Sequence, residues 1–173
     1  MSLQTPPTVQ KLQTALRAKA KGEPAFRFYS LYDKVCRPDV LAHAYRRCKA
    51  NRGAPGVDGQ TFADIEAYGR RRWLGELARE LKEKAYRPQA VRRVWIPKPN
   101  GKQRPLGIPT VRDRVVQMAV LLVVGPIFDV DLILRPRYAV NTRRRLPLQG
   151  IEAVLQQIDR HVVQQAGEPC ASV

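Results

Sequence analysis

A short segment with the pattern of a β-hairpin constrains the fold more than any other part of the sequence. Residues 91–96 are rich in β-forming side chains, and an Asn-Gly dipeptide within Lys98–Lys102 is a strong signal for a tight turn. The return strand is expected over 103–108. Because proline cannot donate a hydrogen bond to a neighbouring strand, Pro97 and Pro105 restrict this hairpin to the edge of a sheet.

The rest of the chain has apolar residues at helical spacing, interrupted by glycine and proline. In chain order we expect a helical arm over 1–35, a helix from Pro38 to Gly53, a glycine-rich loop over 53–61, a helix over 63–84, a helix from Thr110 to Gly125-Pro126, an irregular basic segment over 128–147 and a helix over 148–165. Thr110 and Asp113 have the spacing of a helix N-cap and its third residue. Strands do not alternate with helices, so no parallel sheet is predicted. The predicted fold class is α+β, mostly helical with one β-hairpin.

The chain carries a large excess of positive charge. Its 173 residues include 31 Lys and Arg against 15 Asp and Glu, which gives a formal net charge of +16 and a pI of about 10.5. Self-repulsion of this size is costly unless a polyanion is bound. RNA or DNA is the partner class that fits best, and an anionic membrane surface is second. The plain alternative is a solvated basic surface.

Other features exclude several classes of protein. Apolar residues make up 44% of the chain, which excludes plain disorder. There is no apolar run long enough for a transmembrane helix, and the first ten residues lack the pattern of a secretory signal. Cys36, Cys48 and Cys170 are odd in number and lack CxxC spacing, which argues against a disulfide framework and a zinc site. We therefore expect a cytoplasmic protein without membrane partners.

The sequence predicts no catalytic centre. It contains no P-loop, no GxGxxG and no GxSxG pattern. His43 and His161 are far apart in sequence, and each is interpreted as a helix-face residue. Asp129 and Asp131 are two residues apart and could hold a metal ion, but an exposed acidic corner after a helix is the simpler interpretation.

Basic residues concentrate on and just after the predicted hairpin. Eight basic residues and a single acid lie between Arg87 and Arg114. On the first strand Arg93 and Trp95 share one face, and Arg92 lies on the other. An aromatic ring can stack on a base while neighbouring cations bind phosphates. The alternative is an edge hairpin kept soluble by lysine.

Arg112 and Arg114 fall in the first turn of the helix expected after the hairpin. Cations are unfavourable there, because the helix dipole already presents positive potential. Beside free backbone N–H groups they would form a concentrated anion site. The alternatives are that both side chains point to solvent or that one pairs with Asp113.

Two blocks of sequence resemble the group II intron-encoded reverse transcriptases/maturases of bacteria. The first is NRGAPGVDGQT, residues 51–61, and the second runs from Tyr86 to Gln117 and includes VWIPKPNGK and RPLGIPTVRDRVVQ. With the helices around the first block, the resemblance covers about residues 37–130. It implies the N-terminal extension and the fingers of a right-hand polymerase that copies RNA into DNA.

The resemblance also implies binding roles. In this family, basic residues of the hairpin contact the template and the triphosphate of the incoming nucleotide, which by position gives Lys98, Lys102 and Arg104. We add Arg112 and Arg114 to these candidates for nucleotide and template binding. The expected ligands are a primer-template and dNTP.

The first block is similar to a family segment that supports the template and the intron RNA. Its glycines would allow close approach of the backbone to phosphate, and Asp58 is interpreted as a turn residue rather than a catalytic acid. The expected partner is group II intron-like RNA. The candidates for RNA binding, from this block and from the hairpin, are Asn51, Arg52, Arg92, Arg93 and Trp95.

The sequence departs from the family pattern after about residue 130. Segment 135–147 does not match the second polymerase block, and the aspartates that hold two Mg²⁺ ions in the family are absent. We therefore expect no catalytic residue, metal site or cofactor in this chain, and no polymerisation of DNA by the chain alone. Mg²⁺ is expected only in a complete family member.

The expected division is a helical arm over 1–35, a reverse-transcriptase N-terminal extension and fingers over 36–131, and a divergent, truncated segment over 132–173. The favoured function is a nucleic-acid-binding fingers fragment. The alternatives are a free-standing maturase-like RNA-binding module, a non-functional remnant and, outside the family, a basic structural protein. Without a polymerase palm, the apolar face from Val115 to Leu122 is expected to be exposed and to favour self-association.

Overall fold

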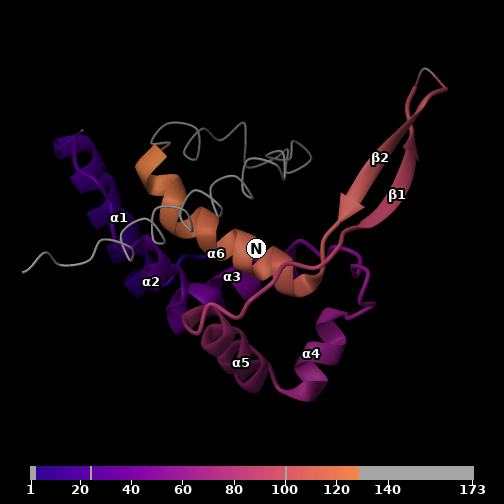
Figure 1. Cartoon of the computed structure of the whole chain (residues 1–173), viewed down its shortest axis with the longest axis horizontal. Coiled ribbons are helices and arrows are strands. Elements are labelled where there is room, and N and C mark those ends of the chain that lie inside the picture. The colour runs from indigo at the N-terminus through magenta and orange to yellow at the C-terminus, as the bar shows by residue number, and fades with distance from the viewer. Residues whose placement is uncertain (1–2, 24, 100, 129–173) are drawn as a thin grey trace, which may run out of the picture. The chain divides into compact units, whose positions relative to one another are not determined.

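The computed structural model describes residues 3–23, 25–99 and 101–128. In chain order its elements are α1 (Pro7–Gly22), α2 (Leu31–Val35), α3 (Pro38–Ala50), α4 (Phe62–Tyr68), α5 (Arg70–Lys82), β1 (Arg92–Pro97), β2 (Gln103–Ile108) and α6 (Val111–Phe128). The two strands pair as one antiparallel hairpin (Figure 1), so the mostly helical α+β class predicted from sequence is confirmed. The helix expected over 148–165 and the pair Asp129 and Asp131 lie outside the described residues.

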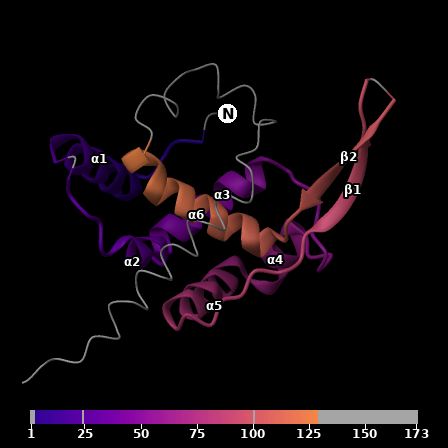
Figure 2. The same cartoon turned by 45° about the horizontal axis from the view of Figure 1, so that its top comes forward.

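Helix α6 lies at the centre of the described core. It contacts α1, α2 and α3, and α3 also contacts α5 (Figure 2). The predicted apolar face of α3 is buried, with Leu41, Ala44 and Tyr45 fully enclosed. Val115 and Leu122 of α6 are buried as well. The expected exposure of this face of α6 is therefore wrong, because α1 and α3 supply its apolar partners.

The helix expected over 63–84 is two helices with a break at Gly69. This glycine has a φ of 104°, a conformation that L side chains rarely adopt. It follows α4 and serves as the N-cap of α5. The bend brings Trp73 of α5 against Tyr45 of α3, with ring centroids 5.9 Å apart. One glycine thus turns a continuous helical pattern into two short helices that cover α3.

Helix α6 continues through Gly125 and Pro126, where the sequence predicted its end. A proline inside a helix has no N–H, so the carbonyl of Leu122, four residues earlier, loses its helical donor. Gln13 of α1 supplies the missing donor, with its Nε2 3.0 Å from the Leu122 carbonyl oxygen. A side chain from the N-terminal arm therefore allows α6 to run on to Phe128.

Replacing Gln13 by leucine should lower the free energy of unfolding by about 1 kcal/mol, because the Leu122 carbonyl loses its donor. In a Pro126→Ala background the helix supplies that donor, so the same replacement should cost less. Urea denaturation of all four proteins measures the coupling between the two sites. Equal costs of Gln13→Leu in both backgrounds would contradict this account of α6.

The hairpin closes within the predicted turn. The Lys98 N–H donates to the Lys102 carbonyl at 2.7 Å, and the Gly101 N–H donates to the Lys98 carbonyl at 3.1 Å. Gly101 has a φ of 74°, the left-handed conformation that favours glycine. This geometry is typical of a three-residue hairpin loop that ends in a left-handed glycine.

Both strand prolines lie where the hairpin needs no hydrogen bond. In an antiparallel pair, bonded partners alternate with partners whose N–H groups point away from the pair. Lys98 and Lys102 form a hydrogen-bonded pair, so the next pair, which contains Pro97, has its N–H groups pointing away from the hairpin. The same is true two residues further on, where Pro105 lies opposite Trp95. The two prolines remove donors from both edges of the hairpin, which disfavours the addition of another strand.

His43 is fully buried on α3, and neither of its ring nitrogens has a hydrogen-bond partner. Burial lowers the pKa of this imidazole below its usual range, and the nearby charges of Arg46 and Arg47 lower it further. The folded protein therefore holds His43 in its neutral form.

Acid should weaken the fold through His43. The unfolded chain binds a proton on this residue below a pKa of about 6.5, whereas the folded chain binds it only at lower pH, so the free energy of unfolding should fall as the pH drops below about 6.5. Denaturation between about pH 5 and 8 measures this loss. His43→Leu should flatten the pH dependence over that range, and an unchanged slope would assign the loss to other groups.

Candidate nucleic-acid interface

The two faces of the hairpin carry different side chains. Residues that are paired across the strands lie on the same face, so the register places Arg92 and Arg104 on one face, at opposite ends of an apolar stretch. Arg93 and Trp95 lie on the other face, as the strand pattern predicted. The candidate residues of the hairpin thus form two surfaces.

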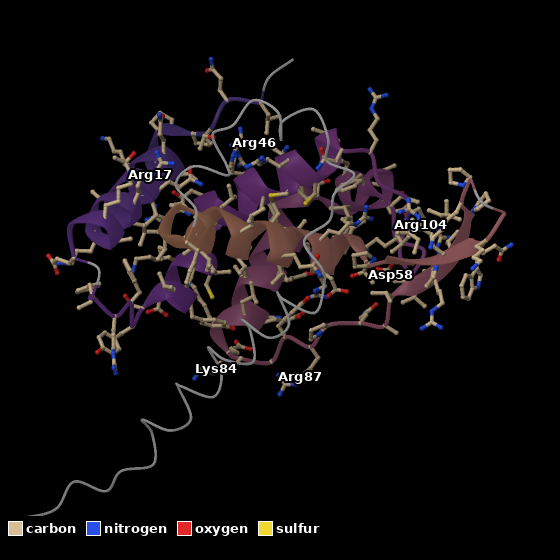
Figure 3. The ribbon with its side chains drawn as sticks, turned by 90° about the horizontal axis from the view of Figure 1, so that it is seen from above. Arg17, Arg46, Asp58, Lys84, Arg87 and Arg104 are labelled. Atoms are coloured by element: carbon tan, nitrogen blue, oxygen red, sulfur yellow. The ribbon has the colours of Figure 1, made fainter. Side chains whose placement is uncertain are left out.

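The cations predicted to bind nucleotide gather near the tip of the hairpin. Lys98 and Lys102 are exposed on either side of the turn. If the alternation of the strands continues by one residue, both lie on the same face as Arg104, whose own side chain is exposed (Figure 3). We call this group of three the tip cations. A tight turn that carries three cations on one face is suited to a polyphosphate.

Most of the hairpin is uncovered in the part of the chain that the structure describes, and only the last three residues of β2, near its base, are half-buried. All of β1 except the half-buried Ile96 is exposed, and Trp95 has 54% of its surface exposed. No carboxylate among the described residues pairs with the arginines of the two strands. Arg92, Arg93 and Arg104 therefore lie without a carboxylate partner among the described residues, beside an accessible indole ring, which suits phosphates and a stacked base.

Asn51 and Arg52 lie together where α3 ends, and both are exposed. The Arg52 N–H donates to the Lys49 carbonyl at 3.1 Å, which closes the last turn of the helix. Arg52 has a φ of 46°, a left-handed conformation that glycine usually supplies at this position. Arg52 is thus an exposed cation at a position of backbone strain.

The two arginines of the first turn of α6 have partners within the fold. Arg112 forms an ion pair with Glu80 of α5. Arg114 donates from Nη2 to the Ala54 carbonyl at 2.8 Å and from Nε to the Thr110 carbonyl at 3.3 Å. These contacts differ from both sequence-based alternatives, because the side chains bind Glu80 and backbone carbonyls rather than solvent or Asp113. Their use as an anion site stays a prediction.

The two sequence blocks that resemble the family meet at the start of α6. Gly56 of the first block is buried against the backbone of the second, so that a Cβ atom added to it would lie 2.6 Å from the Thr110 Cα. Arg114 bonds the Ala54 carbonyl beside this contact. The close approach that glycine permits at position 56 is therefore to the protein's own backbone, whereas the sequence suggested an approach to phosphate.

Asp58 lies at a turn within the first block (Figure 3). Its Oδ1 accepts a hydrogen bond from the Gln60 N–H at 3.3 Å, and Gly59 has a φ of 68°. This bond gives the carboxylate the structural role that was predicted for it.

Gly56→Ala should lower the free energy of unfolding by about 1–3 kcal/mol, because the added methyl group overlaps the Thr110 backbone. Gly75→Ala is the matched control. Gly75 lies within α5 and a Cβ atom there meets nothing within 4 Å, so its replacement should raise the free energy of unfolding by about 0.5–1 kcal/mol. Chemical denaturation measures both, and a neutral Gly56→Ala would contradict the close contact.

Sequence reasoning missed one group at this site. Asp113 was identified only as the third residue after an N-cap, and its N–H does donate to Thr110 Oγ1 at 3.1 Å. The same carboxylate also accepts hydrogen bonds from the Tyr86 hydroxyl and the Gln89 N–H. The capping pattern could reveal the first contact, but no local pattern could reveal partners 24 and 27 residues away.

Several functional classes find no support among the described residues. No three side chains of His, Cys, Asp or Glu gather closely enough to hold a metal ion there. The helices of this part are too short or too polar to cross a membrane. Cys36 and Cys48 are buried free thiols, and burial raises the pKa of Cys48 to about 11.

Comparison with known proteins gives three informative similarities, although no family model matches the chain. Protein YkfC of Escherichia coli is 40% identical over 128 residues, which cover 71% of this chain and 32% of that protein. Group II intron-encoded protein LtrA of Lactococcus lactis is 34% identical over 121 residues, 66% of this chain and 20% of LtrA. The putative COX1/OXI3 intron 1 protein of Saccharomyces cerevisiae is 33% identical over 93 residues, 53% of this chain and 11% of that protein.

The aligned part spans less than a third of the length of each of these relatives. Two of them are named as proteins encoded by introns, and one of these as a protein of a group II intron. The chain is therefore related by sequence to the group II intron-encoded proteins over 66% of its length, and the family resemblance carried by its two sequence blocks is confirmed.

Proposed function

We propose that this chain binds RNA through its hairpin, as the nucleic-acid-binding fingers of a group II intron reverse transcriptase/maturase. The observation that carries the proposal is the uncovered hairpin, with cations on both faces and an exposed Trp95. An exposed indole beside arginines offers stacking to a base and charge to its phosphates. The intron-encoded relatives favour RNA as the polyanion.

Each face of the hairpin has its own part in this proposal. Arg93 and Trp95 on one face bind the RNA strand, together with Arg92 at the base of the other face. Asn51 and Arg52 extend the RNA-binding surface to the end of α3. The tip cations bind the template and the triphosphate of a nucleotide, because three positive charges on one face of a tight turn match a polyphosphate. Arg114 adds positive potential at the start of α6, and Arg112 can contribute only by leaving its ion pair with Glu80.

RNA affinity should depend steeply on salt. If the five basic residues of the hairpin each engage a phosphate, the log–log slope for a single strand should be about −3.5, taking about 0.7 per contact. Binding of a structured intron-like RNA and of a random single strand of equal length, titrated against salt, measures this slope. Arg104→Ala should weaken binding and reduce the slope by about 0.7.

Arg70→Ala is the matched control for Arg104→Ala. Arg70 is an exposed arginine at the start of α5, outside the hairpin. It should leave both affinity and slope nearly unchanged. A flat salt response of the wild-type chain, or equal losses for the two variants, would overturn the assignment of the interface.

Nucleotide binding by the wild-type chain and by a Lys98 variant distinguishes polymerase fingers from a free-standing RNA-binding module. Fingers that keep a triphosphate site should bind dNTP measurably, and Lys98→Ala should weaken nucleotide binding more than RNA binding. An RNA module should bind RNA alone. Absence of nucleotide binding by the wild-type chain would therefore leave the RNA proposal standing and remove the role of the tip cations.

A further inference from the structure

The carboxylate of Asp113 is buried in the first turn of α6, with 3% of the residue exposed. Thr110 Oγ1 donates to its Oδ2 at 2.7 Å, and the Gln89 N–H donates to the same atom at 3.4 Å. The Tyr86 hydroxyl donates to its Oδ1. Three donors and the positive end of the helix dipole thus compensate one buried negative charge.

These donors come from both ends of the hairpin. Tyr86 and Gln89 lie in the segment that leads into β1, which begins at Arg92. β2 ends at Ile108, and Thr110 follows after a single residue, Pro109. One carboxylate therefore holds both the incoming and the outgoing chain of the hairpin at the same point of α6.

The outer part of the hairpin has little to fix its direction. The first strand is exposed apart from the half-buried Ile96, and the second strand is half-buried only over its last three residues, near the base. Besides Asp113, the base is held by the packing of Gly56 against Pro109 and Thr110. A two-stranded hairpin with no covering layer is only marginally stable. Its orientation relative to the helices must then be set mainly at its base, where Asp113 lies.

Tyr86 is suited to be a lasting donor in this contact. Burial raises the pKa of its hydroxyl well above the usual range, and the hydrogen bond to Asp113 raises it further. The phenol is therefore protonated at neutral pH and available as a donor to Asp113.

We propose that Asp113 and Tyr86 are positioning residues for RNA binding, which fix the hairpin on α6 without touching the RNA. This inference rests on the proposed function. It predicts that loosening the base of the hairpin weakens RNA binding through the hairpin cations, although those cations are unchanged. A merely structural pair would instead alter the stability of the whole fold and leave the affinity of the folded protein unchanged.

The test uses Tyr86→Phe, which keeps the ring and removes only the hydroxyl. Tyr68→Phe is the control, because the Tyr68 hydroxyl also donates to a carboxylate, that of Glu76 at 2.7 Å, but on α4 and α5. We expect Tyr86→Phe to speed hydrogen exchange of the hairpin amides over 92–108. The amides of α3 should be affected less. RNA affinity should fall about three- to tenfold, which is less than the loss of a whole hydrogen bond to a charged group, because the loosened hairpin can still reach the RNA. Tyr68→Phe should change neither the hydrogen exchange of the hairpin amides nor the RNA affinity.

A double-mutant cycle separates positioning from general destabilisation. In a background that lacks the strand arginines (Arg92→Ala, Arg93→Ala and Arg104→Ala), Tyr86→Phe should have little further effect on RNA affinity. An equal loss in both backgrounds would overturn the proposal, because the hydroxyl would then act independently of the hairpin. The proteins are compared at equal folded concentration.

Failure of the positioning role and failure of the proposed function are distinguishable. If the wild-type chain shows no salt-dependent RNA binding, the proposed function is wrong, and hydrogen exchange without RNA still tests whether Tyr86 holds the hairpin. Unchanged exchange over 92–108 in Tyr86→Phe would overturn the positioning role whatever the RNA result. Faster exchange with unchanged RNA affinity would also overturn it as a determinant of binding.

Discussion

A buried carboxylate at the N-terminus of α6 is the contact on which the rest of the candidate interface depends. Asp113 satisfies its charge with hydroxyl and backbone donors, and those donors belong to the two chain segments that lead into and out of the hairpin. Burial of an ion is tolerated only where such donors are complete. The need to satisfy one charge therefore ties a largely solvent-exposed element to the central helix of the described core.

The glycine-rich block and the hairpin block are two halves of one contact. They are separated by α4 and α5 in the sequence, yet Gly56 lies directly against the backbone at Thr110, and Arg114 bonds the neighbouring carbonyl. A sequence pattern with many glycines invites an interpretation as a phosphate loop. Here position 56 requires glycine because two backbones touch, which is a structural requirement that would hold even without a ligand.

Local patterns were sufficient to predict most of the helices, the hairpin and the turn at Gly101, because propensity and turn chemistry act over a few residues. They missed the break at Gly69, where two helices replace the one expected over 63–84. They failed where a distant group decides. The passage of α6 through Pro126 needs Gln13, which is 109 residues from its acceptor, and the partners of Arg112 and Arg114 come from α5 and from the loop before α4. The basic face of the hairpin was visible in the sequence, whereas the attachment of its base to Asp113 was not.

The two prolines of the hairpin have a consequence for crowding. If many copies of a cationic protein bound one RNA, their local concentration would be high. Strand edges with unpaired N–H and C=O groups could then pair between molecules and lead to aggregation. Pro97 and Pro105 withhold an outward donor on each edge. If the hairpin binds RNA as proposed, its faces accept the polyanion, while the missing donors at its sides disfavour pairing with a strand of a neighbouring molecule on the same RNA.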